Sequence, residues 1–363
     1  MLSILAILFY SAVVIFLISG LGVSPPRTPS PRLSISVVVA ARNEETGLPK
    51  CLEALVNQDY TKSRLEIIIV DDRSEDSTPE ILSRYKKRFP GLLNTITIPK
   101  TAHHASPKKY ALSRGIESAR GDLIFTTDAD CQPPTSWISD MVPFFTEDIG
   151  LVIGPAPFAE EATCWHHLLA ADNLAKECLA AGAAGWNIAT TCTGRNLAYR
   201  KKVFEELNGF ERFRQSLSGD DDLFVQQVAT RSQWHITYAL DPRVAVPSPA
   251  VKSLFAFVSQ RRRHVSAGKY YTPKLQTAFF LFNLANLWLF LSWGLSCFGV
   301  GSLPIATVFL TIKLVLDFSA LNLMAKYLEK KKVLLIFPLW EIFNLFNQVV
   351  ISPLGFVGNI KWK

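Results

Sequence analysis

The sequence predicts an α/β fold, a Rossmann-like and mostly parallel sheet, with one amino-terminal and two to four carboxyl-terminal membrane segments. Two observations predict it. Short β-branched runs alternate with amphipathic stretches between residues 33 and 130, as in doubly wound sheets. Long apolar runs also lie near both ends of the 363-residue chain, and about 20 apolar residues in a helix cross a bilayer. We therefore expect a membrane anchor over 1–23, an α/β domain over 33–273 and a transmembrane or re-entrant region over 274–363.

The first apolar run extends from Leu2 to Val23 and carries no charge. A cleaved signal peptide is the alternative, but no Lys or Arg precedes the run and no small-x-small cleavage site follows it. The first positive charges, Arg27 and Arg32, follow the run, so the positive-inside rule predicts an outside amino terminus and a cytoplasmic α/β domain at the inner (cell) membrane. Residues 24–32 are rich in proline and predict an extended linker.

Three further apolar blocks follow residue 274. They are Leu275–Phe298, Leu303–Met324 and Val333–Val357. Lys313 and Asp317 lie four residues apart in the second block, and Glu341 lies in the third. Lone charges are costly in lipid, so we expect Lys313 and Asp317 to pair either with each other or with a polar group inside the helix bundle, such as Glu341 for the lysine. The third block is compatible with a single span or with a re-entrant hairpin.

Composition excludes some function classes. The formal net charge of +7 does not indicate nucleic-acid binding, because many basic residues lie beside apolar segments or in one arginine cluster, without a reading helix. We attribute most of this charge to membrane topology. The six cysteines are scattered and form no C-x-x-C pair, which predicts reduced thiols in a cytoplasmic domain.

Four runs rich in Val, Ile and Leu predict strands buried on both faces. They are Ile35–Ala41, Leu65–Asp72, Leu93–Ile98 and Asp122–Asp130. The stretches between them predict helices over Leu48–Gln58, Ser77–Phe89 and Pro107–Ala119. Ligands bind beyond the carboxyl ends of strands in such sheets. The first, second and fourth runs all end in polar residues, so we expect the site at this edge.

Carboxylates follow two of these strands. Asp128 and Asp130 are separated by one small residue, and such a pair suits Mg²⁺ or Mn²⁺ completed by water and phosphate oxygens. The alternative is a turn with two solvated carboxylates. Asp71 and Asp72 end the second strand, where they can accept hydrogen bonds from a base or a ribose. A helix-capping turn is the competing interpretation of that pair.

Charged residues also open two predicted helices. Lys108 and Lys109 follow Pro107, where a lysine and backbone N–H groups can face a diphosphate; solvated lysines are the alternative. Three consecutive carboxylates, residues 220–222, open another helix. Helix capping accounts for one or two of them, but three repel one another, so at least one needs a raised pKa or a close partner. The segment "QRRRH", residues 260–264, suits either a diphosphate or lipid head groups.

The ordered motifs resemble those of membrane-bound family 2 glycosyltransferases with a GT-A fold. In chain order they read "VVVAARNEE", "IIIVDDRSEDST", "PKKYALSRGIESARGDLIFTTDADC", "TGRNLAYR", "GDDDLFVQQ" and "QRRRH". They span Val37 to His264. The resemblance implies an inverting, metal-dependent hexosyltransferase that takes a sugar from a UDP- or GDP-sugar donor. A lipid or glycan acceptor at the membrane is also implied.

The resemblance also implies roles for individual residues. On the donor side, Arg42 and Glu44 line the nucleotide site, and Asp71 or Asp72 holds the nucleotide base. Lys108 lies near the phosphates, Asp128 and Asp130 serve the metal and the nucleotide sugar, and Gln260 and Arg263 close over the diphosphate. On the acceptor side, Asp220 or Asp221 is the catalytic base. Two departures qualify this pattern. Gly219 stands before the aspartates where the family commonly has Glu, so the base stays open between Asp220 and Asp221. His264 replaces a tryptophan common in polysaccharide synthases, which weakens processive synthesis as an alternative function.

A third function comes from another class. A membrane-anchored protein that binds a nucleotide sugar without catalysis would share the anchor and the fold. Loss of the D-x-D pair or of the acidic run would favour it, but both are present.

Overall fold

The computed structural model describes residues 1–23, 27, 33–99, 106–159 and 163–357. The predicted linker 24–32 therefore lies, apart from Arg27, outside the described residues. The chain forms two compact units. We call residues 24–160 and 187–250 the sheet unit, and residues 1–23, 161–186 and 251–363 the helical unit. The predicted 33–273 domain boundary stays a prediction.

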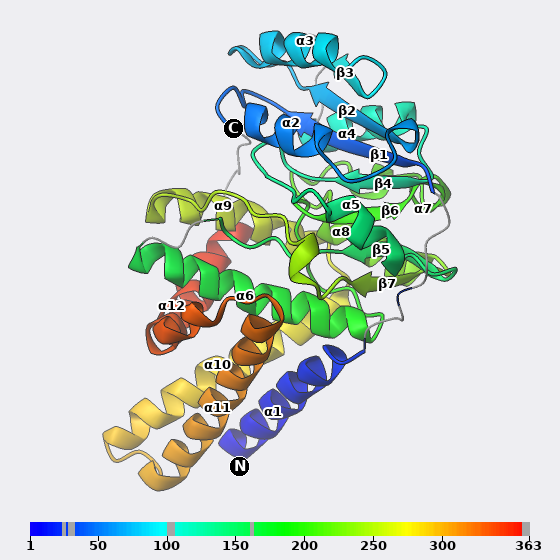
Figure 1. The fold of residues 1–363 in the computed structure, drawn as a ribbon. Helices are drawn as coiled ribbons and strands as arrows, with labels where there is room; N and C mark the ends of the chain where they lie inside the picture. Colours follow the sequence, from blue (N-terminus) through cyan, green and yellow to red (C-terminus); the bar gives the residue numbers. More distant parts are fainter. Residues whose placement is uncertain (24–26, 28–32, 100–105, 160–162, 358–363) are drawn as a thin grey trace. The chain divides into compact units, whose positions relative to one another are not determined.

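The sheet unit is built on one seven-stranded sheet with the order β3-β2-β1-β4-β6-β5-β7, visible in Figure 1. The strands are β1 (Ile35–Ala41), β2 (Leu65–Asp71), β3 (Leu93–Thr97), β4 (Leu123–Thr126), β5 (Ile149–Ile153), β6 (Leu197–Arg200) and β7 (His235–Tyr238). Only β6 runs antiparallel to its neighbours β4 and β5. The prediction of a mostly parallel α/β sheet is confirmed.

The helices of the sheet unit lie between the strands along the chain. They are α2 (Leu48–Val56), α3 (Thr78–Arg88), α4 (Pro107–Ser118), α5 (Trp137–Met141), α7 (Lys201–Glu206) and α8 (Asp222–Arg231). The strand predicted over Asp122–Asp130 is shorter than expected, because β4 ends at Thr126. Thr127 then donates a side-chain hydrogen bond of 2.8 Å to the carbonyl of Arg195. The D-x-D pair therefore lies in a loop beyond the strand.

Alternating residues of β1 pack on opposite faces of the sheet. Val37 and Val39 belong to a core cluster with residues of α2, α3 and α5. Val38 faces α4, where a side chain at Gly115 would overlap Val38 and meet Val70 at 3.0 Å. A glycine is therefore needed for α4 to approach the sheet so closely. Burying each such Val or Ile side chain contributes about 1.5–3 kcal/mol, and this packing holds α4 against the sheet.

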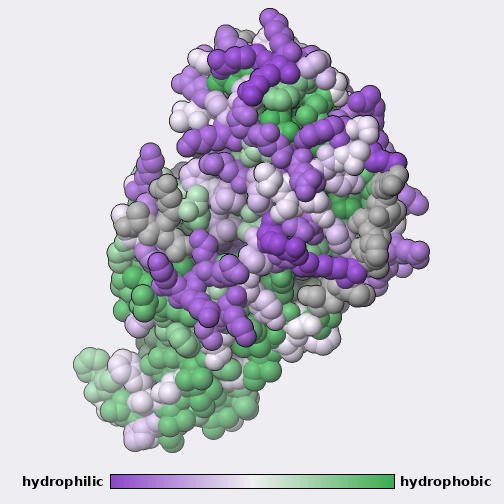
Figure 2. All heavy atoms as spheres, viewed as in Figure 1, coloured by the Kyte–Doolittle hydropathy of each residue, from purple (hydrophilic) through white to green (hydrophobic). Residues whose placement is uncertain are grey.

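The described residues of the helical unit contain four segments long and apolar enough to cross a membrane: Leu2–Gly20, Pro273–Cys297, Leu303–Tyr327 and Lys331–Phe356. The first three are α1, α10 and α11, and the last includes α12 (Phe337–Phe346). One amino-terminal and three carboxyl-terminal segments thus agree with the prediction. On the face shown in Figure 2, apolar side chains predominate in the region of α10 and α11. Two more helices belong to this unit, α6 (Cys164–Gly185) and α9 (Leu254–Ser266).

The charges inside the apolar helices pair as expected. Lys313 Nζ lies 2.9 Å from Asp317 Oδ2 and also contacts Glu341. Tyr10 of α1 donates its hydroxyl to both Asp317 oxygens at 2.8 Å, and Lys313 Nζ lies 4.5 Å from the centroid of the Phe290 ring. This buried network links α1 to α11 and α12.

Candidate active site

The loops after β1 and β2 are joined by side-chain hydrogen bonds. Ser74 Oγ accepts from the Asn43 backbone at 3.0 Å, and Asn43 Oδ1 accepts from the Glu75 backbone at 2.8 Å. Asn43 and Arg73 both have positive φ, 54° and 60°, a conformation that Asn tolerates and that is unusual for Arg. These bonds fix the backbone that carries Arg42 and Glu44, both half-buried.

Asp71 and Asp72 are both buried at the end of β2. Asp71 Oδ1 accepts a hydrogen bond from the Ser74 backbone at 3.1 Å, which closes a turn. Asp72 Oδ1 accepts from Arg73 Nε at 2.8 Å. Asp71 therefore closes a local turn, whereas Asp72 pairs with the neighbouring arginine. Their expected contact with a nucleotide base stays a prediction.

Asp128, Asp130 and Cys131 form the acidic end of the β4 loop. One ligand atom from each lies within 4.8 Å of the others. A Cβ at Gly47 would lie 3.0 Å from Cα and Cβ of Asp130, so a glycine lets the loop lie against the start of α2. Burial and the charge of Asp128 raise the pKa of Asp130. The loop thus concentrates negative charge that a cation would relieve.

The donor set fits a hard divalent cation. Carboxylate oxygens are the ligands that Mg²⁺ and Mn²⁺ prefer. Cys131 is buried, and burial together with Asp128 and Asp130 raises the pKa of its thiol. The thiol therefore keeps its proton, and its Sγ lies 3.7 Å from Asp130 Oδ1 as a weak donor. Asp128 and Asp130 are the residues that would hold the ion.

Lys108, in the first turn of α4, joins this loop to the acidic run. Its Nζ lies 2.8 Å from Asp128 Oδ1 and 2.9 Å from Asp220 Oδ2. Burial opposes the charge, but Asp128, Asp220 and Asp221 outweigh it and raise the pKa of Lys108 well above its usual value. The structure therefore brings together three residues that are separated by up to 112 positions in the sequence.

Two carboxylates of the acidic run, Asp220 and Asp221, have different partners. Asp221 is the N-cap of α8 and accepts backbone hydrogen bonds at 2.8 Å from Asp222 and from Gly194. Burial, with Asp220 adding to it, raises the pKa of Asp221. Asp220 instead pairs with Lys108. The expectation of a raised pKa or a close partner in this run is confirmed on both counts.

Comparisons with known proteins agree with this arrangement. Residues 36–208 match the family model described as Glycosyl transferase family 2. The chain contains a family 2 glycosyltransferase domain. Among curated proteins, it is 30% identical over 196 residues to the probable glycosyltransferase YdaM of Bacillus subtilis, covering 53% of this chain and 46% of that protein. It is 27% identical over 216 residues to the glycosyltransferase AglE of Haloferax volcanii, covering 57% and 64%.

A third relative is the beta-monoglucosyldiacylglycerol synthase of Synechocystis, 33% identical over 115 residues, which covers 32% of this chain and 23% of that protein. The chain therefore spans less than two thirds of each of these relatives. Among solved structures, the mannosyltransferase PcManGT of Pyrobaculum calidifontis, in complex with GDP-Man and Mn²⁺, aligns with a TM-score of 0.60. The alignment covers 95% of this chain and 99% of that one at 19% identity, and it shows a shared GT-A fold.

Gln260 and Arg263 lie in α9, which belongs to the helical unit and not to the glycosyltransferase sheet. The other arginines of this motif make contacts inside that unit. Arg261 Nη2 lies 3.3 Å from Oδ1 of Asp172 in α6. Arg262 donates hydrogen bonds of 3.2 Å to the backbone carbonyls of Leu354 and Val357. The expected contact of Gln260 and Arg263 with a diphosphate stays a prediction.

Sequence reasoning missed one cation of the glycosyltransferase domain, Arg195, and assigned the wrong surroundings to another, Lys109. Arg195 donates to Thr193 Oγ1 at 3.0 Å and to Ser248 Oγ, and its charge acts on Asp130. A charged residue inside "TGRN" was the available signal. Lys109 was expected to face a diphosphate or solvent, but its ammonium is buried against backbone carbonyls.

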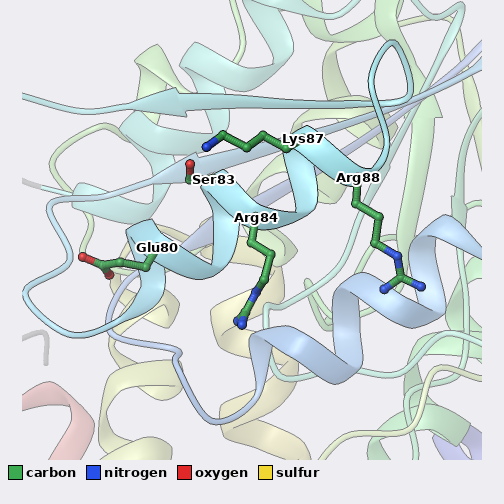
Figure 3. Close-up of a pocket in the computed structure, with 5 residues that line it drawn as sticks. All are labelled: Glu80, Ser83, Arg84, Lys87 and Arg88. Atoms are coloured by element: carbon green, nitrogen blue, oxygen red, sulfur yellow. The ribbon is translucent and has the colours of Figure 1, made fainter.

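A shallow groove lies elsewhere on the glycosyltransferase domain, along α3 (Figure 3). It is lined by Glu80, Ser83, Arg84, Lys87 and Arg88. All five side chains come from a single helix. Arg88 forms a salt bridge with Glu53, with 2.6 Å between Nη1 and Oε1. The groove contains none of the residues of the acidic site and has no arrangement suited to group transfer.

Proposed function

We propose that this protein is an inverting, metal-dependent hexosyltransferase that moves a sugar from a UDP- or GDP-sugar to a lipid-linked acceptor at the membrane. The observation that carries the proposal is the double contact of Lys108. Because one ammonium reaches both Asp128 and Asp220, the carboxylate suited to the donor's metal and a carboxylate suited to the acceptor lie on either side of a single cation. A transfer site needs both within one cleft.

The chemistry follows from these side chains. A Mg²⁺ or Mn²⁺ ion held by Asp128 and Asp130 would neutralise charge on the leaving diphosphate. Lys108 adds a positive charge beside the same group. Asp220 takes the proton from the acceptor hydroxyl, whose oxygen bonds to the anomeric carbon as the bond to the diphosphate breaks on the opposite face. Configuration at that carbon is inverted.

The hydrogen bonds favour Asp220 over Asp221 as the base. Both oxygens of Asp221 accept backbone N–H groups, so its role as a helix cap is well defined. One oxygen of Asp220 pairs with Lys108, and a carboxylate has further lone pairs for a substrate hydroxyl. We assign catalysis to Asp220 and local structure to Asp221.

Two observations support a lipid acceptor. Four apolar segments would keep the chain at a bilayer, where lipid-linked hydroxyls or phosphates are concentrated. The names of two relatives also contain a lipid, a monoglucosyldiacylglycerol in Synechocystis and a dolichyl N-acetyl-alpha-D-glucosaminyl phosphate in Methanococcus voltae. We infer a multi-pass protein of the cell membrane whose glycosyltransferase domain faces the cytoplasm.

Transfer can be measured with purified protein in lipid nanodiscs, a membrane lipid extract, Mn²⁺ and radiolabelled UDP- and GDP-sugars. We expect label in the organic phase with one donor, and none with Asp128→Asn or Asp130→Asn. Label in a water-soluble polymer would identify a polysaccharide synthase instead. Tight donor binding without label in either phase would identify a binding protein.

A further inference from the structure

Lys109 occupies an unusual position for a lysine. Its side chain is 3% exposed, and its Nζ donates to the carbonyls of Phe213, Ser216 and Ser218 at 2.8, 2.5 and 3.1 Å. An ammonium has three N–H donors, so these carbonyls use all of them. The Phe213 ring centroid lies 5.1 Å from the same nitrogen.

The three carbonyls belong to the segment that leads into the acidic run. This segment, residues 213–218, begins at the end of the short helix Glu211–Phe213 and is followed by Gly219 and Asp220. Gly219 has φ +94°, a conformation that glycine adopts without strain. Ser106, at the N-cap of α4, donates to the Leu217 carbonyl at 3.4 Å. The start of α4 therefore holds the segment at four carbonyls.

We propose that Lys109 is a positioning residue for sugar transfer, because its ammonium holds the backbone of residues 213–218 and thereby sets the reach of the Asp220 carboxylate. Lys108 fixes the carboxylate and Lys109 fixes the backbone before it, so two adjacent residues of α4 define its position from both sides. A displacement of about 1 Å at a reacting group can cost about 10²-fold in rate. The inference rests on the proposed function, since it assigns Asp220 to catalysis.

The charges around Lys109 predict a pH dependence. Burial lowers the pKa of Lys109 to about 8, against the opposing charges of Asp220, Asp222 and Asp221. These carboxylates come from the segment end and from α8, Lys108 is the neighbouring cation on α4, and Arg212 and Arg214 beside Phe213 are exposed. Above pH 8 the amine keeps only two N–H groups for three carbonyls. Above this pH the hydrogen bonds from Lys109 to the backbone of residues 213–218 therefore weaken, and turnover falls.

Global stability changes in the opposite direction. An unfolded lysine has a pKa of about 10.4, so between pH 8 and that value the unfolded chain binds more protons at Lys109 than the folded chain does. The contribution of Lys109 to the free energy of unfolding therefore rises with pH in this window. Turnover lost through Lys109 is thus not explained by unfolding.

The test compares Lys109→Met with the matched control Lys62→Met. Lys62 Nζ also donates to backbone carbonyls, those of Val56 and Gln58 at 2.7 and 2.9 Å, but before β2 and outside the site. Three quantities are measured: hydrogen exchange of residues 213–222, affinity for UDP and GDP with Mn²⁺, and turnover of the labelled donor by transfer or hydrolysis. We expect faster exchange in that segment only for Lys109→Met, unchanged nucleotide affinity, and turnover lower by about 10²-fold.

If hydrogen exchange at residues 213–222 is unchanged in Lys109→Met, Lys109 does not restrain this backbone segment, whatever the activity of the variant. Faster exchange with normal turnover would overturn the positioning role. If wild type itself shows no turnover, the proposed function fails while the exchange result still decides the hold. Should Lys109→Met not fold, wild type and Lys109→Arg are compared at pH 7 and pH 9.5. A decline in wild-type turnover at pH 9.5 that Lys109→Arg abolishes supports the proposal, and equal profiles contradict it.

Discussion

Lys108 and Asp220 form an ion pair inside the sheet unit, with 2.9 Å between Nζ and Oδ2 and only 8% of the Asp220 side chain exposed. Removing the ammonium leaves Asp220 and Asp128 close together without their shared cation. We expect Lys108→Met to lower the free energy of unfolding by about 1–3 kcal/mol, the usual cost of an unsatisfied buried polar group. Much of this loss should be recovered in the double variant Lys108→Met/Asp220→Asn, because the buried charge is then removed as well.

Denaturant unfolding of the four proteins in this cycle measures the coupling. The matched control is Lys202→Met, whose partner Glu206 lies 3.7 Å away on an exposed helix surface. Exposed pairs contribute about 0–1 kcal/mol. Additive losses in the Lys108 and Asp220 variants would show that the two residues do not depend on each other.

Metal binding at the D-x-D loop should depend on pH. Burial and Asp128 raise the pKa of Asp130, and a cation binds only the ionised carboxylate. Protons therefore compete increasingly as pH falls, and the affinity for Mn²⁺ should be lower at pH 5.5 than at pH 7.5. Calorimetric titration with Mn²⁺ and UDP measures this directly, and Asp130→Asn should remove most of the difference.

Cys131→Ala is the control for the metal prediction. Its thiol is protonated and buried, so the affinity for Mn²⁺ should change little. A large loss of affinity in Cys131→Ala would identify the sulfur as a ligand. Equal affinity of wild type at both pH values would contradict the competition by protons.

The first half of the sheet was predictable because its signals are local. β1 has the predicted bounds, Ile35–Ala41, since a run of β-branched residues buried on both faces determines a strand without help from distant residues. The end of β4 was not predictable in the same way. It depends on Thr127 bonding to the carbonyl of Arg195, which is 68 residues away. Contacts between such distant positions leave no periodic pattern in the sequence.

The site also combines features that the sequence predicted from local signals with features that depend on contacts between distant residues. The acidic motifs were found because carboxylates after apolar strands are conspicuous in a sequence. Their partners were not, because a lysine at a helix start is compatible with solvent, diphosphate or protein carbonyls. Lys108 and Lys109 are adjacent and chemically identical, yet one bridges two carboxylates and the other holds three carbonyls. Only the fold of residues 213–220 around α4 distinguishes them.

The buried network of the helical unit gives a further prediction. Asp317→Leu leaves the Tyr10 hydroxyl without its acceptor and leaves Lys313 with fewer counter-charges. Breaking a buried pair from one side is costly, about 3–5 kcal/mol, so the yield of folded protein in detergent should fall sharply. The double variant Lys313→Met/Asp317→Leu should lose less, because no uncompensated ammonium remains. Equal loss in the single and double variants would argue against a functional pair.

The identity of the base gives the last prediction. Asp220→Asn removes the group that accepts the acceptor's proton but keeps an oxygen for Lys108, so donor affinity should stay nearly intact while turnover falls by roughly 10²- to 10⁴-fold. Asp221→Asn weakens the cap of α8 and the bond from Gly194, so it should cost about 1 kcal/mol of stability and little turnover. Thermal unfolding, UDP and GDP titration and label transfer measured on both variants separate these effects. If Asp221→Asn loses turnover at normal stability while Asp220→Asn retains it, Asp221 is the base and the assignment from the hydrogen bonds is wrong.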